Sequence, residues 1–137
     1  MSFESHMSAL HSFIATNYTS TPVAYGGGVV FDSEDVGDWV KVSILDGTAT
    51  QISLSGGVEC YRYLGIINIV IYAAPTITGK TAENKVREYA DTLTTLFLAN
   101  KTQSNVLYRV PSLAVLGESD GYFSVALSVP FQRDQLI

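Results

Sequence analysis

ECYRYLGIINIVIY, residues 59–72, decides the fold because it is the longest strand candidate in the chain. From Ile66 to Ile71 every residue except Asn68 is apolar, and most are β-branched. Such a run is typical of a central strand that is covered on both faces. The run is too short to cross a bilayer. Gly65 within it indicates a bulge or a close approach of another group.

The preceding segment, residues 39–55, alternates apolar and polar residues in two halves. Val40, Val42 and Ile44 share one face of the first half, and the second half alternates again from residue 50 to residue 55. Asp-Gly at residues 46–47 is a turn signal. The pattern therefore predicts a β-hairpin over residues 39–55, with Gly56-Gly57 after it.

Apolar residues at spacings of three and four predict two amphipathic helices, at residues 3–17 and 79–99. Thr78 is the expected N-cap of the second helix. The connection at residues 18–37 is expected to be irregular apart from a short strand at Val29–Phe31. The sequence does not indicate what the loop from Gly26 to Asp38 does.

The last third of the chain returns to strand patterns. Short strands are expected at residues 106–110 and 113–116 around Pro111. A turn at Asp120-Gly121 then leads into residues 123–131, which alternate strictly. The polar tail from residue 132 is expected to be mobile unless a partner holds it.

This order of elements predicts an α+β fold with a mixed, mainly antiparallel sheet and two helices packed on one face. The chain has 137 residues, a length that suits one domain spanning residues 1–137. We detect no internal repeat, linker or low-complexity segment.

Composition restricts the class of function. Charged residues make up only 15% of the chain, so much of the surface must be neutral, and the 8 tyrosines favour protein interfaces. A net charge of −5 argues against direct nucleic-acid binding. The beginning of the sequence lacks a secretory signal, and Cys60 is the single cysteine. We expect a soluble, cytosolic protein in which Cys60 is a small buried hydrophobe, with no membrane association.

Residues 74–81, Ala-Pro-Thr-Ile-Thr-Gly-Lys-Thr, resemble a relaxed phosphate-binding loop between a strand and a helix. The phosphate-binding loop works because its glycines let backbone amides surround a phosphate. Here three β-branched residues in a row and a single Gly79 oppose that geometry. A nucleotide-binding domain using Gly79-Lys80-Thr81 is therefore the less favoured alternative.

Other catalytic or metal-binding patterns are weak. His6 and His11 lie five residues apart, which places them on different faces of a helix. Four carboxylates in one loop, Asp32, Glu34, Asp35 and Asp38, lack the register of a calcium loop and are interpreted as a solvated acidic loop. We expect no catalytic residue, no metal site and no cofactor.

Two segments carry the residue types that are enriched at desolvated interfaces. Tyr61-Arg62-Tyr63 lies at the entry to the central strand. Phe131 ends the last predicted strand, and Arg133 and Asp134 follow it at once. These six residues form the candidate surface for contact with another subunit or a tube. Arg133→Ala is expected to impair assembly far more than monomer folding, because a charge just past a strand end is not expected in the core.

The chain resembles the tail terminator (tail completion) proteins of long-tailed bacteriophages. The resemblance covers most of the chain and rests on an ordered set of features. These are the opening helix with a Pro-containing extended segment, Trp39-Val-Lys-Val42, Gln51-Ile-Ser-Leu54, Tyr61-Arg-Tyr-Leu-Gly65, Gly79 before a helix that carries Tyr89-Ala-Asp91 and Leu96-Phe97, Gly121-Tyr-Phe123 and Pro130-Phe-Gln-Arg-Asp134.

The resemblance implies a structural, non-enzymatic virion protein with helices packed on a sheet. Such proteins form a hexameric ring that caps the tail tube, stops its polymerisation and offers a surface for head-neck attachment. The implied partners are further copies of the chain, the major tail tube protein and a head-neck connector protein. The implied location is the virion tail, after assembly in the cytoplasm of the host bacterium. The alternative is another small head-tail neck or minor tail protein.

Overall fold

The computed structural model describes residues 3–25, 37–55, 58–74, 81–103, 106–119 and 121–136. Their elements, in chain order, are α1 (Phe3–Asn17), β1 (Val23–Tyr25), β2 (Trp39–Ser55), β3 (Val58–Ala73), α2 (Ala82–Ala99), β4 (Thr102–Gln103), β5 (Val106–Tyr108), β6 (Ser112–Ser119) and β7 (Tyr122–Leu136). The expected strand at residues 29–31 lies outside the described residues.

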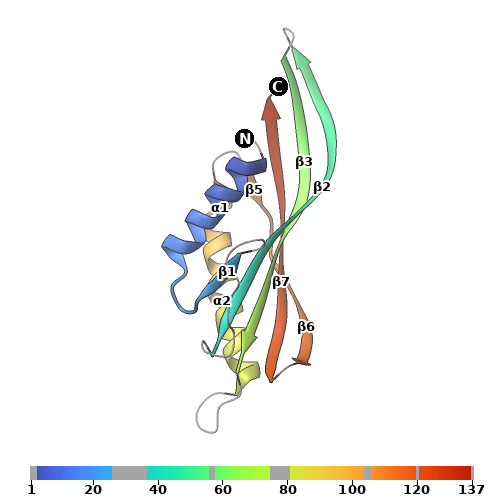
Figure 1. Cartoon of the computed structure of the whole chain (residues 1–137). Coiled ribbons are helices and arrows are strands. Elements are labelled where there is room, and N and C mark those ends of the chain that lie inside the picture. The colour runs from blue at the N-terminus through green and yellow to red at the C-terminus, as the bar shows by residue number, and fades with distance from the viewer. Residues whose placement is uncertain are drawn as a thin grey trace.

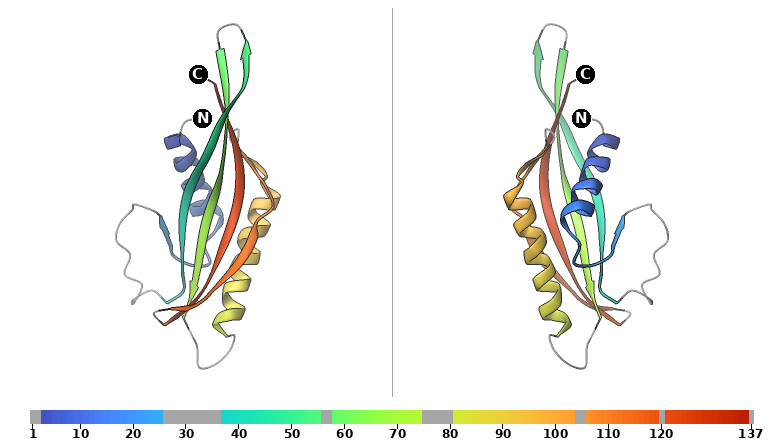
Figure 2. Two further views of the ribbon diagram at one scale, coloured as in Figure 1. Left: turned by 90° about the vertical axis from the view of Figure 1, so that its right-hand side faces the viewer. Right: turned by 90° about the vertical axis from the view of Figure 1, so that its left-hand side faces the viewer.

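The described strands form one sheet in the order β1-β2-β3-β7-β5-β4, and β6 also pairs with β7. Only β1 and β2 run parallel, and the other pairs are antiparallel. Both helices lie on one side of the sheet, and its other side is in view in the left panel of Figure 2 (Figures 1 and 2). The predicted fold class is confirmed, with β3 in the centre as expected.

The core fills the space between the sheet and the two helices. In β3, Ile67, Ile69 and Ile71 are fully buried on the face toward the helices. The helices contribute buried residues at helical spacing, and α2 supplies Val86, Ala90, Leu93 and Phe97. The predicted helices are therefore found, α1 with the predicted bounds. Helix α2 begins later than predicted because Thr81 caps it, accepting a hydrogen bond from the Asn84 amide at 3.2 Å.

The prediction of a hairpin over residues 39–55 is wrong. These residues form the single strand β2, which pairs with β3 over its whole length. The Asp46-Gly47 step is an irregularity in the pairing and not a turn, because the register shifts between Asp46 and Ala49. Pairing between the two strands instead continues to Ser55↔Val58. β2 and β3 thus extend past both helices as an arm, which β7 joins as far as Cys60↔Leu136 (Figure 1).

The polar end of the chain is also ordered, contrary to the expectation of a mobile tail. β7 continues to Leu136 because β3 begins early enough to pair with it, from Cys60↔Leu136 onward. The segment at Val23–Tyr25 was expected to be irregular, but it forms β1 beside Val40–Val42 of β2. Beyond Val42, no other described strand pairs with the outer edge of β2.

Close packing at one glycine connects the centre of the sheet to α1. A Cβ built on Gly65 would lie 2.5 Å from Cζ of Phe131 and 2.6 Å from the Leu45 carbonyl oxygen. The Phe131 ring therefore occupies the space above Gly65, and His6 of α1 packs on that ring with centroids 4.7 Å apart. The predicted close approach at Gly65 is confirmed.

Candidate functional site: the uncovered face of the sheet

Neither of the two described helices covers the second face of the sheet, and we refer to this face as the open face (Figure 2, left). Paired residues of adjacent strands lie on the same face, so the register identifies its side chains. Leu45 pairs with Ile66, and Ile66 pairs with Pro130. The prediction that both faces of β3 are covered is wrong for the single chain, because Ile66 is 41% exposed.

Exposed apolar side chains gather in the middle of the open face. Leu45, Leu64 and Ile66 are 58%, 45% and 41% exposed, respectively. Neutral residues surround them, since Ser43 pairs with Asn68 and Asn68 pairs with Ser128. Contiguous exposed apolar residues mark an interaction surface more often than isolated ones do. Among the described residues, this area has the properties of the centre of a protein interface.

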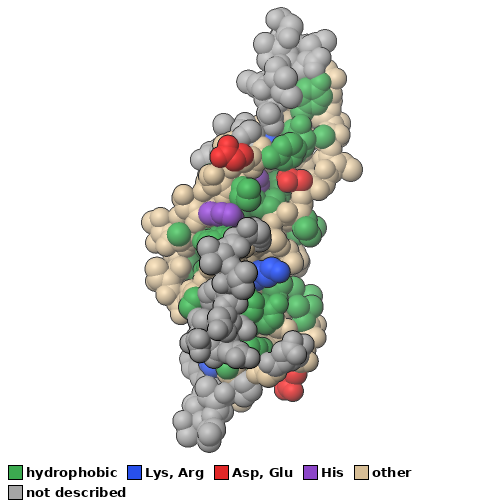
Figure 3. Space-filling model, viewed as in Figure 1, with side chains coloured by type: hydrophobic (Ala, Val, Ile, Leu, Met, Phe, Trp, Pro, Cys, Tyr) green, Lys and Arg blue, Asp and Glu red, His purple; other side chains and the backbone are tan. Residues whose placement is uncertain are grey.

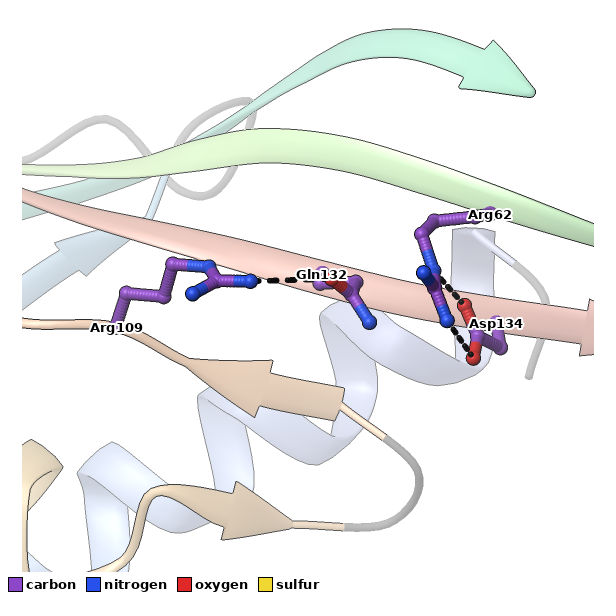
Figure 4. Close-up of polar contacts among 4 residues, drawn as sticks. All are labelled: Arg62, Arg109, Gln132 and Asp134. Atoms are coloured by element: carbon purple, nitrogen blue, oxygen red, sulfur yellow. Dashed lines mark hydrogen bonds and ion pairs between the residues drawn. The ribbon is translucent and has the colours of Figure 1, made fainter. Parts of the chain in front are cut away.

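Polar contacts border the apolar area (Figure 4). Arg62 of β3 binds Asp134 of β7 through both oxygens, with Nε to Oδ1 at 3.0 Å and the second guanidinium nitrogen to Oδ2 at 3.2 Å. The hydrogen bond raises the pKa of Arg62, which stays charged. Nearby, Arg109 donates to the Gln132 side-chain oxygen at 3.3 Å. These groups form the kind of polar rim that surrounds interface centres.

The six candidate interface residues fall into three groups. Arg62 and Asp134 lie together on the open face, and Tyr61 and Tyr63 are partly exposed but point to the helix side in the register with β7. Phe131 and Arg133 are buried at 2% and 0% exposure, so their side chains are not available to a partner. The expectation that Arg133 is an interface residue fails because its side chain is held inside the fold.

Arg133 is enclosed by aromatic rings. Its Cζ lies 4.5 Å from the ring centroids of both Phe3 and Tyr63, and its guanidinium lies 3.8 Å from Asp46. Cation–π contacts are strongest when the cation is removed from water. The burial of Arg133 was not predicted from the sequence, because its position near the end of a strand does not indicate that α1 packs over it. The alternation of β7 places Arg133 on the same face as buried Phe131, and that was the available signal.

The sequence candidates for other chemistry also have structural positions. His6 is buried and its Nε2 lies 3.1 Å from the Tyr108 hydroxyl, whereas the His11 ring packs on Tyr25. Burial, with a contribution from the Arg133 charge, lowers the pKa of His6 to about 4. Cys60 is partly buried. Gly79 and Lys80 lie outside the described residues.

Asp38 was interpreted as part of a solvated acidic loop, and for this residue the interpretation is wrong. Its carboxylate accepts hydrogen bonds from the Tyr89 hydroxyl at 2.7 Å, the Ala74 amide at 2.9 Å and Lys85 Nζ at 3.1 Å. Burial acts to raise the pKa of Asp38, but these bonds outweigh burial and lower it. The other carboxylates of that loop, at residues 32, 34 and 35, lie outside the described residues.

The described residues contain no cluster of three or more His, Cys, Asp or Glu side chains that could hold a metal ion. Neither described helix combines the length and apolar character that crossing a membrane requires.

Comparison with known proteins supports the fold and gives no function. No family model matches the sequence, and no curated protein matches it. Among 20 matching chains of solved structures, one whose name describes no function has a TM-score of 0.63. It shares 17% sequence identity over 96% of this chain and 95% of its own length. At this identity the similarity shows a shared fold alone.

Proposed function

We propose that this protein is a structural component of a long bacteriophage tail, a terminator that assembles into a ring, caps the tail tube and presents a surface to the head-neck connector. The observation that supports a role in assembly is the open face, where Leu45, Leu64 and Ile66 are exposed on a rigid sheet. A surface of this kind suits a protein partner better than a small molecule.

The tail-terminator part of the proposal rests on the sequence resemblance. The ordered set of features ends in Pro130-Phe-Gln-Arg-Asp134, and in the structure these residues belong to β7 beside the central strand. Ring formation through a head-to-tail interface is a physical route to a fixed number of subunits. No step of this role requires a catalytic group or a cofactor.

Removal of the protein from the assembling phage tests the proposal. A terminator stops polymerisation of the tube, so particles assembled without it are expected to carry tails of uncontrolled length by electron microscopy. Normal tail length with unattached heads would instead support the alternative of a neck protein. A gene position just before the gene of the major tube protein would further favour the terminator.

The second alternative, a nucleotide-binding domain, has a direct test. A thermal-unfolding shift with Mg-ATP or Mg-GTP that disappears in Lys80→Ala would support nucleotide binding and oppose the structural role.

A further inference from the structure

We propose that neighbouring copies of this chain join edge to edge, with β6 of one copy added to the outer edge of β2 of the next, so that apolar side chains of β6 enter the groove beside α1. This inference deepens the proposed function, because it rests on self-assembly and specifies which surfaces meet. It leaves the open face free for a different partner.

The first supporting feature is a groove between α1 and β2. It has a volume of about 480 Å³ and is lined by the apolar side chains of Phe3, Met7, Val42 and Ile44. Phe3 and Met7 are largely exposed within it. Figure 3 looks onto this side of the molecule and shows hydrophobic side chains between α1 and the arm, close to acidic groups.

The second feature is the edge of β2 beside this groove. β1 covers the edge only as far as Val42, and no other described strand pairs with it beyond that residue. An uncovered edge offers backbone amide and carbonyl groups to an incoming strand. A strand added after Val42 would run along the groove and place alternate side chains in it.

The third feature is β6, on the opposite edge of the same sheet. It pairs with β7 on one side, and no described strand pairs with its other side. Val115 and Leu116 are 54% and 57% exposed, and Leu113 is also exposed. β6 therefore combines an available backbone edge with apolar side chains, which are the two properties needed to occupy the groove.

Strand direction and side-chain facing both agree with this pairing. The neighbouring strands β2, β3, β7 and β6 alternate in direction, so β6 runs opposite to β2. In two copies with the same orientation, β6 of one copy is therefore antiparallel to β2 of the other. Leu113 and Val115 pair with buried Leu127 and Val125, so they point to the helix side of the sheet. The groove lies on that same side. A second copy thus fits without any inversion of its sheet.

Charge is also complementary across the two edges. Glu4 and Asp46 line the groove. Arg109 lies between β5 and β6, Lys101 lies just before β4, and both residues are exposed. Because the two contacting surfaces differ, the interface is heterologous, and repeated contacts of that kind generate a closed ring when the rotation between copies closes.

A charge exchange in the full-length protein tests the contact. Leu113→Lys and Met7→Glu are each expected to reduce self-association at least tenfold by analytical ultracentrifugation, and the double variant is expected to recover most of it. Leu98→Lys is the matched control because Leu98 on α2 is also 39% exposed, as Leu113 is. Unchanged thermal unfolding of every variant would show that they fold.

Cross-linking gives an independent readout. The test uses a chain in which Cys60→Ser removes the native cysteine. With both Met7→Cys and Val115→Cys in this chain, a short bismaleimide is expected to produce a ladder of cross-linked oligomers. With only one of the two cysteines, cross-linking should stop at the dimer. A chain that gives no ladder at its highest soluble concentration overturns the proposal. Self-association that resists Leu113→Lys but is lost in Ile66→Lys overturns it too, because the copies would then meet through the open face.

These outcomes are distinct from failure of the terminator role. Edge-to-edge assembly with normal tail length in particles that lack the protein would refute the terminator function and retain the contact. Uncontrolled tail length in particles that lack the protein would support the terminator function. If Leu113→Lys then still formed the oligomer, the proposed contact between β6 and β2 would be refuted.

Discussion

Arg133 illustrates how one residue can join the beginning and the end of the chain. Its guanidinium lies between the ring of Phe3 in α1 and the ring of Tyr63 in β3, with Asp46 nearby. Arg62 is one residue away from Tyr63, yet it faces the other side of the sheet and is partly exposed. Two arginines in neighbouring rows therefore have opposite environments.

Arg133→Ala is expected to lower the free energy of unfolding by about 2–4 kcal/mol, because it empties a buried site and removes two cation–π contacts. Chemical denaturation of the isolated protein measures the change. Arg62→Ala is the control, and loss of its solvent-exposed ion pair is expected to change stability far less than Arg133→Ala does. Equal effects of the two substitutions would contradict the assignment of Arg133 to the core.

His6 makes a pH-dependent contribution to stability. Its pKa is lowered to about 4, first by burial and then by the Arg133 charge, while Asp46 acts in the opposite direction. The unfolded chain binds the proton more tightly, so the contribution is complete above pH 6.5 and is lost as the pH falls through 4.

As the pH falls from 6.5 to about 4, we therefore expect the free energy of unfolding to decrease by up to about 1.4 kcal/mol per pH unit. His6→Gln, which can keep a hydrogen bond to the Tyr108 hydroxyl, should flatten this slope. Denaturation curves at several pH values provide the measurement. An identical slope in the variant would show that other groups cause the acid sensitivity.

At the scale of elements, Asp38 connects the start of β2 to the end of β3 and to α2. It binds the Ala74 amide just after β3, and it binds Lys85 and Tyr89 of the helix. Burial, and next the hydrogen bond to Asp38, raise the pKa of the Tyr89 hydroxyl. The carboxylate thus fixes where the helix lies along the sheet.

Asp38→Asn is expected to lower the free energy of unfolding at neutral pH by about 1.5–3 kcal/mol, because the bonds lose their charge. The difference from wild type should shrink as the pH falls below 3.8, the ordinary pKa of the group, because the unfolded chain then takes up a proton that the lowered pKa of Asp38 disfavours in the folded protein. Asp91→Asn, on an exposed part of α2, is the control and should change stability by less than about 0.5 kcal/mol. A constant difference at all pH values would contradict this account.

The elements differed in how far sequence could predict them. Helix periodicity gave α1 with its bounds, and the apolar run gave β3 in the centre of the sheet. The Asp46-Gly47 pair suggested a turn because local signals do not show that β3 is long enough to pair with all of β2. The same non-local pairing ordered residues 132–136, which are polar and unremarkable when considered alone.

The candidate surface was predicted in part. Arg62 and Asp134 were selected for their residue types, and they do lie together at the border of the open face. Leu45, Leu64 and Ile66 were missed because a continuous apolar run does not distinguish a strand buried on both faces from one that leaves a face to a partner. Their exposure depends on where the helices pack, which requires the tertiary structure.

For the whole molecule, a substitution on the open face should separate folding from assembly. Ile66→Lys places a charge at a position that is already 41% exposed, so the melting temperature should stay within a few degrees of wild type. We expect this variant to form the same homo-oligomer and to fail to cap tails in a complementation assay scored by electron microscopy. Leu98→Lys should complement normally. Rescue of tail length by Ile66→Lys would show that the open face does not contact the tube.

The short strand β1 has a consequence for the geometry of any array built from these sheets. It occupies the edge of β2 only at Val40–Val42, and β6 lies beside residues 122–128 of β7, toward the same end of the sheet. The β6 strand of a neighbour that avoids β1 must therefore be shifted along β2, past Val42 and toward the arm. Each copy is then shifted along the strands relative to the previous copy. In a closed ring, such a shift would tilt the strands relative to the ring axis.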